Sequence, residues 1–441
     1  MGEERFEKHL KQIVANMNYE YKDGRLSAID LTFTLIEKIP KELLARHMQM
    51  LFLALVLQMV NDDSNDCRQR VIKCLELLFG RSSATMLQDM HGYIERWAKQ
   101  PGQMTSASLQ VFSVFIEARS DFIKQNGALL EWSQNLEMHL NSNQSEWEVL
   151  YFSLICVEKL SKSFDSYLTR TNDLWNGIVE CLTNAHPWVR LASCRILNKA
   201  LASNGLDGVL DNNLGMLFQI VRNLCFLMNA GEEEFSTELS ELSIKTLTLT
   251  LPIMNERPHL CFVKDEEADG RDPVKWLLNR LSQIAKAKGR KRRIGIFKCF
   301  AAFASCHSVI VSPHLELMLE PLHRSQIETR NELENPSVSH KEDSGGEITN
   351  ESNLAAEVFQ LLEETTESAD TFWKALAAVK KRALDKKEQR KLEMKLEAAN
   401  DPQAAALRKI KKQEHEKKRK KRRVEERRQE RGATKKRRNW N

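Results

Sequence analysis

The residues best suited to chemistry are two runs of cations near the end of the chain. Seven consecutive cationic residues are followed, after a gap, by four more. They are Lys417, Lys418, Arg419, Lys420, Lys421, Arg422, Arg423, Lys435, Lys436, Arg437 and Arg438. Import receptors read such Lys- and Arg-rich runs, and the same side chains neutralise phosphates by releasing condensed counterions. The runs therefore predict RNA binding, nuclear import through an import receptor, or both.

Positive charge is concentrated in this tail. The formal net charge is +5, but residues 408–438 alone hold eighteen Lys or Arg and five Glu, a net of +13. The remainder of the chain is therefore acidic, with a net of −8. An acidic body with a basic tail predicts an anionic partner for the tail. The alternative is a solvated charged helix that only aids solubility.

A second basic patch lies inside the body of the chain. Six of the eight residues from 286 to 293 are cationic: Lys286, Lys288, Arg290, Lys291, Arg292 and Arg293. An apolar helix is expected directly after them, and cations at a helix start oppose the helix dipole. Two interpretations remain open for this patch, namely contact with phosphate and a solvated turn between helices.

No sequence motif for catalysis is present. The sequence lacks the common phosphate-loop, dinucleotide, nucleophile-elbow and zinc-protease patterns, and its eleven His are scattered. The acidic run Asp62–Asp66 lacks the Gly and terminal Glu of a calcium loop. We expect it to cap a helix beginning at Cys67. These observations predict a protein that is not an enzyme and takes no small-molecule substrate.

The nine cysteines predict neither disulfides nor a metal site. Their number is odd and no C-x-x-C pair occurs, which favours a reducing compartment. Cys299, Cys306, His307 and His314 come nearest to a ligand set, but their spacing matches no zinc pattern. We expect no metal and no other cofactor.

The most apolar run predicts a buried helix. Met48–Val60 is thirteen residues long and includes two Gln, which is too short to span a bilayer. We therefore expect no membrane partner.

Helical segments recur along the chain at a nearly constant interval. Only 17 Gly and 10 Pro interrupt 441 residues, which favours a mostly helical protein. The repeating segments begin near Gly24, Asp66, Thr105, Ser145, Pro187, Ser236 and Gly289. Their steps are about 42, 39, 40, 42, 49 and 53 residues, and a period of about 40 to 47 is typical of HEAT and armadillo arrays.

Each recurring segment has an expected partner helix. The predicted partners are Lys41–Val60, Thr85–Lys99, Phe122–Leu140, Phe164–Leu182, Leu210–Met228 and a helix that starts at Pro273 with Asp272 as its cap. Such hairpins bury their apolar faces by stacking on neighbours. The aromatic residues Phe33, Phe52, Phe112, Phe115, Trp147, Phe152 and Phe218 are assigned to this core.

The predicted fold is all-α, a HEAT/armadillo-like α-solenoid followed by a disordered acidic linker and a long basic helical tail. The solenoid is expected over residues 1–324 and the linker over 325–353, where acidic residues outnumber basic ones. An amphipathic to charged helix follows over 354–401, and the basic helical tail covers 402–441.

Two short strings resemble a known family. They are His186-Pro187-Trp188-Val189-Arg190-Leu191-Ala192 and Tyr21-Lys22-Asp23-Gly24-Arg25-Leu26-Ser27-Ala28. Both resemble the carboxy-terminal region of the DRIM (down-regulated in metastasis) family, long HEAT-repeat proteins of the small-subunit processome. The resemblance implies a nucleolar scaffold in 18S rRNA maturation whose partners are pre-ribosomal RNA and processome proteins.

A length of 441 residues is far too short for a whole member of that family. We therefore expect a carboxy-terminal fragment or a truncated gene model. The alternative function is a HEAT-repeat nuclear transport adaptor of the importin type, whose acidic concave face would capture basic cargo. The net of −8 for the body permits this, whereas the basic tail fits it poorly.

Overall fold

The computed structural model describes most of the chain. The described residues are 3–142, 145–164, 167–169, 172–203, 205–228, 236–262, 272–286, 290–334 and 344–400, followed by 403, 406–407, 410–411, 413–414 and 417–418. Within these residues every regular element is a helix.

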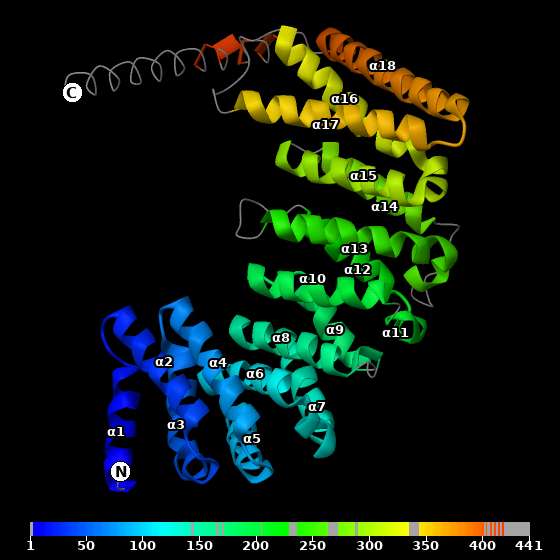
Figure 1. Cartoon of the computed structure of the whole chain (residues 1–441). Coiled ribbons are helices and arrows are strands. Elements are labelled where there is room, and N and C mark those ends of the chain that lie inside the picture. Colours follow the sequence, from blue (N-terminus) through cyan, green and yellow to red (C-terminus); the bar gives the residue numbers. More distant parts are fainter. Residues whose placement is uncertain are drawn as a thin grey trace, which may run out of the picture. The chain divides into compact units, whose positions relative to one another are not determined.

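Eight helices contact one another in sequence order and form a continuous ladder (Figure 1). These ladder helices are α2 (Lys22–Lys38), α4 (Asn65–Arg81), α6 (Gln103–Gln125), α8 (Trp147–Ser163), α10 (Pro187–Ala202), α13 (Ser236–Glu256), α15 (Arg290–Val311) and α17 (Ser344–Thr365). Seven of them begin within two residues of a start that the sequence period predicts. The period therefore locates the helix starts along the stack.

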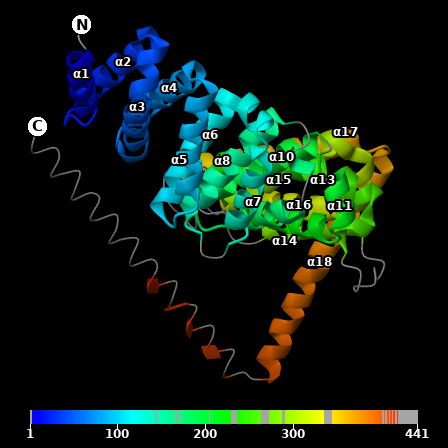
Figure 2. The same ribbon diagram turned by 90° about the horizontal axis from the view of Figure 1, so that it is seen from below.

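The remaining helices of this part form a second layer, and most of them pack against a ladder helix. They are α1 (Glu3–Asn16), α3 (Lys41–Asn61), α5 (Ala84–Ala98), α7 (Ala128–Leu140), α9 (Asn172–Cys181), α11 (Asp207–Asn212), α12 (Met216–Leu227), α14 (Pro273–Lys286) and α16 (Leu315–Glu334), with short 3-10 turns at Tyr167–Thr169, Pro258–Cys261 and Ser312–His314. Figure 2 shows α10, α13 and α15 on one side of the stack and α14 and α16 on the other. This two-layer stack of hairpins is the predicted HEAT/armadillo-like solenoid.

Two predicted partner helices are shorter than expected because glycines end them. Gly127 and Gly215 have φ angles of 65° and 89° and stand directly before α7 and α12. This left-handed conformation strains side-chain-bearing residues, and it breaks a helix. The predicted Phe122–Leu140 thus divides between the end of α6 and α7, and Leu210–Met228 divides between α11 and α12. The predicted Phe164–Leu182 likewise begins only at Asn172.

Several ladder helices carry an arginine at their fourth position that fastens the preceding loop. Arg25 Nη1 donates to the carbonyls of Tyr19 and Glu20, and Arg68 Nη1 donates to that of Asp62. Arg190 Nη1 donates to Asn184 and Ala185 in the same way. Because the loop carbonyls have no helical partner of their own, these bonds fix the angle at which the chain enters each helix.

The core is continuous from one hairpin to the next. Phe79 of α4 lies with its ring centroid 6.2 Å from that of Phe52 in α3 and 5.0 Å from that of Phe115 in α6, and all three are completely buried. Replacing such a phenylalanine with alanine typically costs about 3–5 kcal/mol of stability. Of the other aromatic residues assigned to the core, Phe112 is buried, whereas Phe33, Phe152 and Phe218 are half-buried.

The predicted boundary after residue 324 is wrong. Helix α16 continues to Glu334 and α17 begins at Ser344, so much of the predicted disordered linker, 325–353, is helical. Ser325 and Glu351 are buried, and the compact first unit extends through Glu367. Residues 335–343 lie outside the described part. The second unit holds α18 (Ala369–Asn400), and residues 354–365 end α17 in the first unit. The segment expected as one helix over 354–401 is therefore helical on both sides of a break at 366–368.

Two stretches are long and apolar enough, by length and composition alone, to cross a membrane. They are Lys41–Asn61 and Arg293–Glu328, and the first contains the predicted buried run Met48–Val60. In Lys41–Asn61 the apolar residues Leu51, Phe52 and Leu55 are completely buried against neighbouring helices. A core helix of a helical repeat has the same composition as a short membrane span, and the packing of Lys41–Asn61 accounts for its apolar residues.

Candidate functional site

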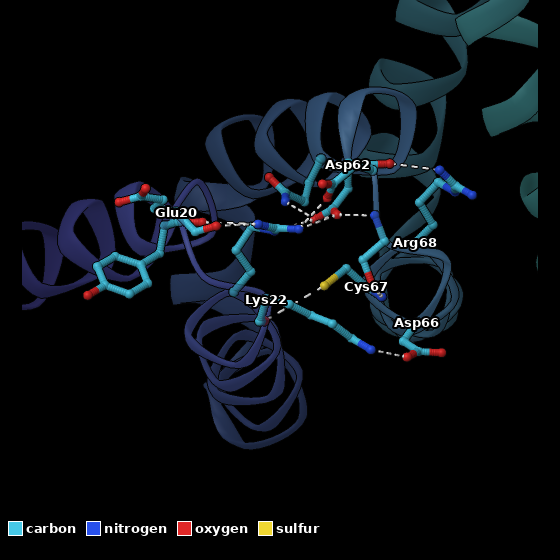
Figure 3. Close-up of polar contacts among 11 residues, drawn as sticks. Glu20, Lys22, Asp62, Asp66, Cys67 and Arg68 are labelled. Atoms are coloured by element: carbon cyan, nitrogen blue, oxygen red, sulfur yellow. Dashed lines mark hydrogen bonds and ion pairs between the residues drawn. The ribbon is translucent and has the colours of Figure 1, made fainter. Parts of the chain in front are cut away.

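A dense polar cluster joins α2 to the loop before α4 (Figure 3). Arg25 belongs to the family-like string at residues 21–28, and its Nε and Nη2 lie 3.0 and 2.9 Å from the carboxylate oxygens of Asp62. The Asp62 side chain is fully buried and that of Arg25 is 12% exposed. A two-point guanidinium–carboxylate pair of this kind fixes direction as well as distance. The string is therefore a structural joint between neighbouring hairpins.

Asp62 organises the loop before α4 and does not cap the helix itself. It accepts hydrogen bonds from the Ser64 N–H at 2.8 Å and from the Gln58 amide. Burial raises the pKa of Asp62, but the bonds from Arg25, Ser64 and Gln58 outweigh burial and the net shift is downward. The helix begins at Asn65, with the Ser64 hydroxyl accepting from Cys67 N–H. The run Asp62–Asp66 therefore does cap the helix as expected, but through the hydroxyl of Ser64 and not through an Asp or Asn, and the helix begins two residues before Cys67.

In the family-like string at residues 186–192, the side chains likewise fix the loop that precedes the helix. The Asn184 side chain accepts the His186 N–H at 2.8 Å, Pro187 occupies the first turn of α10, and Arg190 donates to two loop carbonyls. These three interactions set the start of the helix without an ordinary side-chain cap. Arg195, one turn further on, pairs with Glu238 of α13 at 2.8 Å.

The four residues closest to a metal-ligand set do not come together. His307 Nε2 is hydrogen-bonded to the Thr248 carbonyl at 3.0 Å, and His314 pairs with Asp272 at 2.9 Å. Cys299 is completely buried. In the part of the chain that the structure describes, no group of three potential ligands surrounds a common point.

The internal basic patch is only partly available to an outside anion. Lys286 Nζ lies 2.8 Å from Glu320, and Arg293 Nη1 lies 2.7 Å from Glu328 and 3.3 Å from Glu351. These two cations therefore pair within the solenoid, an arrangement that neither of the two open interpretations, phosphate contact and a solvated turn, included. Lys288 and the side chains of Arg290, Lys291 and Arg292 lie outside the described residues.

The basic tail begins on an exposed helical surface. Lys417 and Lys418 are helical and exposed. The other predicted tail residues, Arg419–Arg423 and Lys435–Arg438, lie outside the described part. Helix α18 already carries nine Lys or Arg against five Asp or Glu, and the side chains of Lys380, Lys387 and Lys391 are exposed. Sequence reasoning placed the basic surface after residue 402 and so missed its start on α18, although the charge count of residues 369–400 was sufficient to find it.

One aromatic cluster was missed altogether. Trp147 was assigned to the core, but it is 38% exposed and stacks on His186 of the next hairpin. Tyr151 and Trp188 complete the group, which we call the aromatic corner. The only sequence signal was the position of both tryptophans in the first turn of a helix, where a side chain points less deeply into the stack.

Comparison with known proteins gives a family and a fold. A family model described as "Small subunit processome component 20 homolog, C-terminal" matches residues 161–426. The U3 small nucleolar RNA-associated protein 20 of Saccharomyces cerevisiae is 23% identical over 433 residues, which is 92% of this chain and 16% of that protein. Its namesake in Schizosaccharomyces pombe is 24% identical over 268 residues, which is 58% of this chain and 10% of that protein. The chain thus spans a small part of the length of either relative.

Among solved structures, yeast importin-beta (Kap95p) is similar with a TM-score of 0.51 and 12% identity, over 80% of this chain and 42% of that one. Kap95p in a structure with RanGDP gives a TM-score of 0.51 and 11% identity, over 86% and 45%. At such low identity the likeness shows the solenoid fold alone.

Proposed function

Because the chain belongs to the family of small subunit processome component 20 homologues, whose carboxy-terminal region it matches, we propose that it is a non-catalytic scaffold of the small-subunit processome. The relatives are named for association with U3 small nucleolar RNA. The resemblance to the DRIM family that the two strings carry is thereby confirmed. The proposed role is to hold protein and pre-ribosomal RNA partners together in the nucleolus during 18S rRNA maturation.

The solenoid supports this proposal through its surface. A stack of hairpins in which each contacts only its neighbours offers a long face to several partners at once. The two-point pair between Arg25 and Asp62 and the loop bonds of Arg190 stiffen the joints between hairpins. A scaffold needs such joints because they keep distant binding surfaces at fixed separations.

The basic surface that starts on α18 supports contact with RNA. Exposed lysines such as Lys380, Lys387 and Lys391 can approach phosphates, and such contacts position a protein without reading bases. The same cations are what an import receptor would recognise, so we propose both roles for the tail. No membrane and no small-molecule partner is part of the proposal.

The importin-type adaptor finds no specific support. The importin structures resemble this chain in fold alone, at 11–12% identity. This similarity gives no reason to expect that the chain binds cargo. The family match, in contrast, rests on sequence over residues 161–426. We therefore retain the processome scaffold as the single proposal.

The proposal predicts that the full chain, fused to a fluorescent protein, concentrates in nucleoli and co-sediments with U3 small nucleolar RNA. A variant lacking residues 408–441 should remain in the cytoplasm, provided that the fusion is too large to enter the nucleus passively. Adding a foreign import signal should restore nuclear entry. If the tail also contacts RNA, this rescued protein should stay nucleoplasmic and lose co-sedimentation.

The control is the full chain carrying the same foreign signal, which should remain nucleolar. Full nucleolar recovery of the rescued deletion would show that the tail acts only as an import signal. A full chain that reaches the nucleus but shares no gradient fraction with U3 RNA would contradict the scaffold proposal.

A further inference from the structure

The aromatic corner is a partly exposed group of four rings on two adjacent ladder helices. Trp147 and Tyr151 come from the first turns of α8, and His186 and Trp188 come from the start of α10. These two helices are neighbouring rungs of the ladder (Figure 1). The corner therefore has a rigid base, because its rings are held by two packed helices and the Asn184 loop.

The rings are ordered in a specific geometry. Trp147 and His186 stack nearly parallel, with centroids 3.7 Å apart and planes 7° apart. Trp188 stands almost perpendicular to Trp147, with centroids 6.1 Å apart and planes at 87°. Tyr151 closes the group at 5.4 Å from Trp188. The rings of Trp147 and Trp188 are therefore perpendicular, so the flat face of one indole lies beside the edge of the other.

The exposure of the two tryptophans sets them apart in this solenoid. Trp132 and Trp175 are completely buried, whereas Trp147 and Trp188 are 38% and 37% exposed. Tryptophan is strongly enriched among residues that dominate protein–protein binding energy. A partly exposed pair of tryptophans on one rigid base is therefore a candidate docking point.

The charges around the corner favour a cationic ligand. Glu146 is exposed and Glu148 is half-buried, and the two flank Trp147 in the sequence. The cations of α10 are already engaged: Arg190 with the loop carbonyls, Arg195 with Glu238 and Lys199 with the Ser161 hydroxyl. With two acids beside Trp147 in the sequence and the α10 cations engaged elsewhere, the local charge disfavours a phosphate group, and so RNA, as the ligand.

We propose that the aromatic corner binds an arginine-bearing, extended segment of a partner protein. A planar guanidinium stacks on indole rings and pairs with carboxylates in two-point geometry, which matches the two kinds of group present. Lysine fits less well because its compact ammonium has no flat face. This binding point is separate from the phosphate contacts proposed for the tail.

The test measures binding of a fluorescein-labelled peptide of alternating arginine and glycine to the full chain by fluorescence anisotropy. The same peptide with citrulline in place of arginine keeps the shape and loses the charge. We expect the arginine peptide to bind at least about tenfold more tightly than the citrulline peptide. Trp188→Ala should weaken arginine-peptide binding by about tenfold or more, and Glu146→Gln with Glu148→Gln by several-fold.

Trp373→Ala is the matched control, since Trp373 is 52% exposed but belongs to α18. It should leave peptide binding unchanged. Trp188→Phe keeps an aromatic ring and should retain most of the affinity, which separates loss of the ring from loss of folding. Equal affinity for the arginine and citrulline peptides, or equal losses in Trp188→Ala and Trp373→Ala, would overturn the proposal. So would a corner variant that loses binding to a uridine oligonucleotide while keeping the peptide.

Discussion

Nη1 of Arg293 lies 3.3 Å from Oε1 of Glu351, a buried carboxylate 58 positions further along the chain. The same nitrogen lies 2.7 Å from Oε2 of Glu328, and Arg293 Nε donates to the carbonyl of Ala285 at 3.1 Å. The Ser325 hydroxyl donates to Glu351 at 2.7 Å. One guanidinium on α15 thus connects the end of α14, α16 and α17, and we call this group the terminal lock.

The terminal lock predicts a large and local loss of stability on removal of its cation. Arg293→Met leaves Glu351 buried with a carboxylate that has lost its guanidinium, and removing one partner of a buried pair typically costs about 3–5 kcal/mol. Hydrogen exchange measured by mass spectrometry should then accelerate over residues 344–365 and 315–334. Arg293→Lys should show an intermediate effect.

A matched control for the terminal lock is Lys298→Met on the same helix. Lys298 pairs with Glu241 at 3.6 Å, but both side chains are about half exposed, so this pair should contribute little. Unchanged exchange in Arg293→Met would mean that α17 is held by its apolar face alone.

The terminal lock also shows what sequence reasoning could not see. The acids near residues 328 and 351 were assigned to a disordered linker, and Arg293 to a patch left open between phosphate contact and a solvated turn. Neither assignment included a partner within the fold, because a single sequence shows none. The structure pairs these charges with one another.

The helical period, in contrast, was sufficient for the fold. The starts of seven ladder helices follow from apolar residues at three- and four-residue steps, because a hairpin that stacks on two neighbours must repeat its buried face. Gly127 shows where this reasoning stops. The apolar period continues through it, whereas its left-handed backbone, after the cap residue Asn126, separates α6 from α7. Sequence reasoning also failed to predict that Trp147 is exposed. Periodicity shows which face of a helix a residue lies on, but not how deeply its side chain is buried.

The joint between Arg25 and Asp62 predicts that lysine cannot replace this arginine. A lysine ammonium provides no two-point fork, so Arg25→Lys should leave Asp62 underbonded at a cost of about 1–3 kcal/mol. Hydrogen exchange should accelerate over α2 and the start of α4. The control Lys11→Met removes an exposed pair with Glu7 and should have little effect.

The same joint has a defined pH dependence. The pKa of Asp62 is lowered in the folded protein by Arg25, Ser64 and Gln58 despite the opposing effect of burial. Its contribution to stability is therefore complete above the unfolded value of about 4 and is lost as the pH falls through the lower folded value. The stability difference between the native chain and Asp62→Asn should shrink on acidification below about pH 4. A constant difference down to pH 2 would show that the charge of Asp62 does not matter.

His91 predicts a second, milder acid sensitivity in the middle of the solenoid. Its Nε2 accepts a hydrogen bond from Trp132 Nε1 at 3.0 Å, and its Nδ1 lies 3.3 Å from Glu95. Burial lowers the pKa of His91 to about 4, against a smaller upward effect of Glu131. The folded state therefore resists protonation, and its stability should fall as the pH drops from about 6.5 towards 4.

Between pH 7 and pH 5 this effect should cost about 2 kcal/mol. His91→Gln keeps an acceptor for Trp132 and carries no titrating ring, so it should not show this part of the loss. The measurement compares hydrogen exchange of α5–α7 in the two proteins at each pH, so that intrinsic exchange cancels. Parallel losses in both proteins would assign the acid sensitivity to other groups.

The last prediction separates the two roles within the internal basic patch. Arg293 is committed to the terminal lock, whereas Arg290, Lys291 and Arg292 precede it on the first turn of α15. In a chain lacking residues 408–441, the triple change Arg290→Glu, Lys291→Glu and Arg292→Glu should weaken binding to a uridine oligonucleotide at low salt. The reason is that each lost phosphate contact reduces counterion release, so the salt dependence of affinity should flatten as well. The thermal midpoint of the triple variant should change little.

Arg293→Glu should instead lower the thermal midpoint, because it places a third carboxylate beside Glu328 and Glu351. RNA affinity that is unchanged by the triple variant at low salt would assign the three residues to a solvated turn.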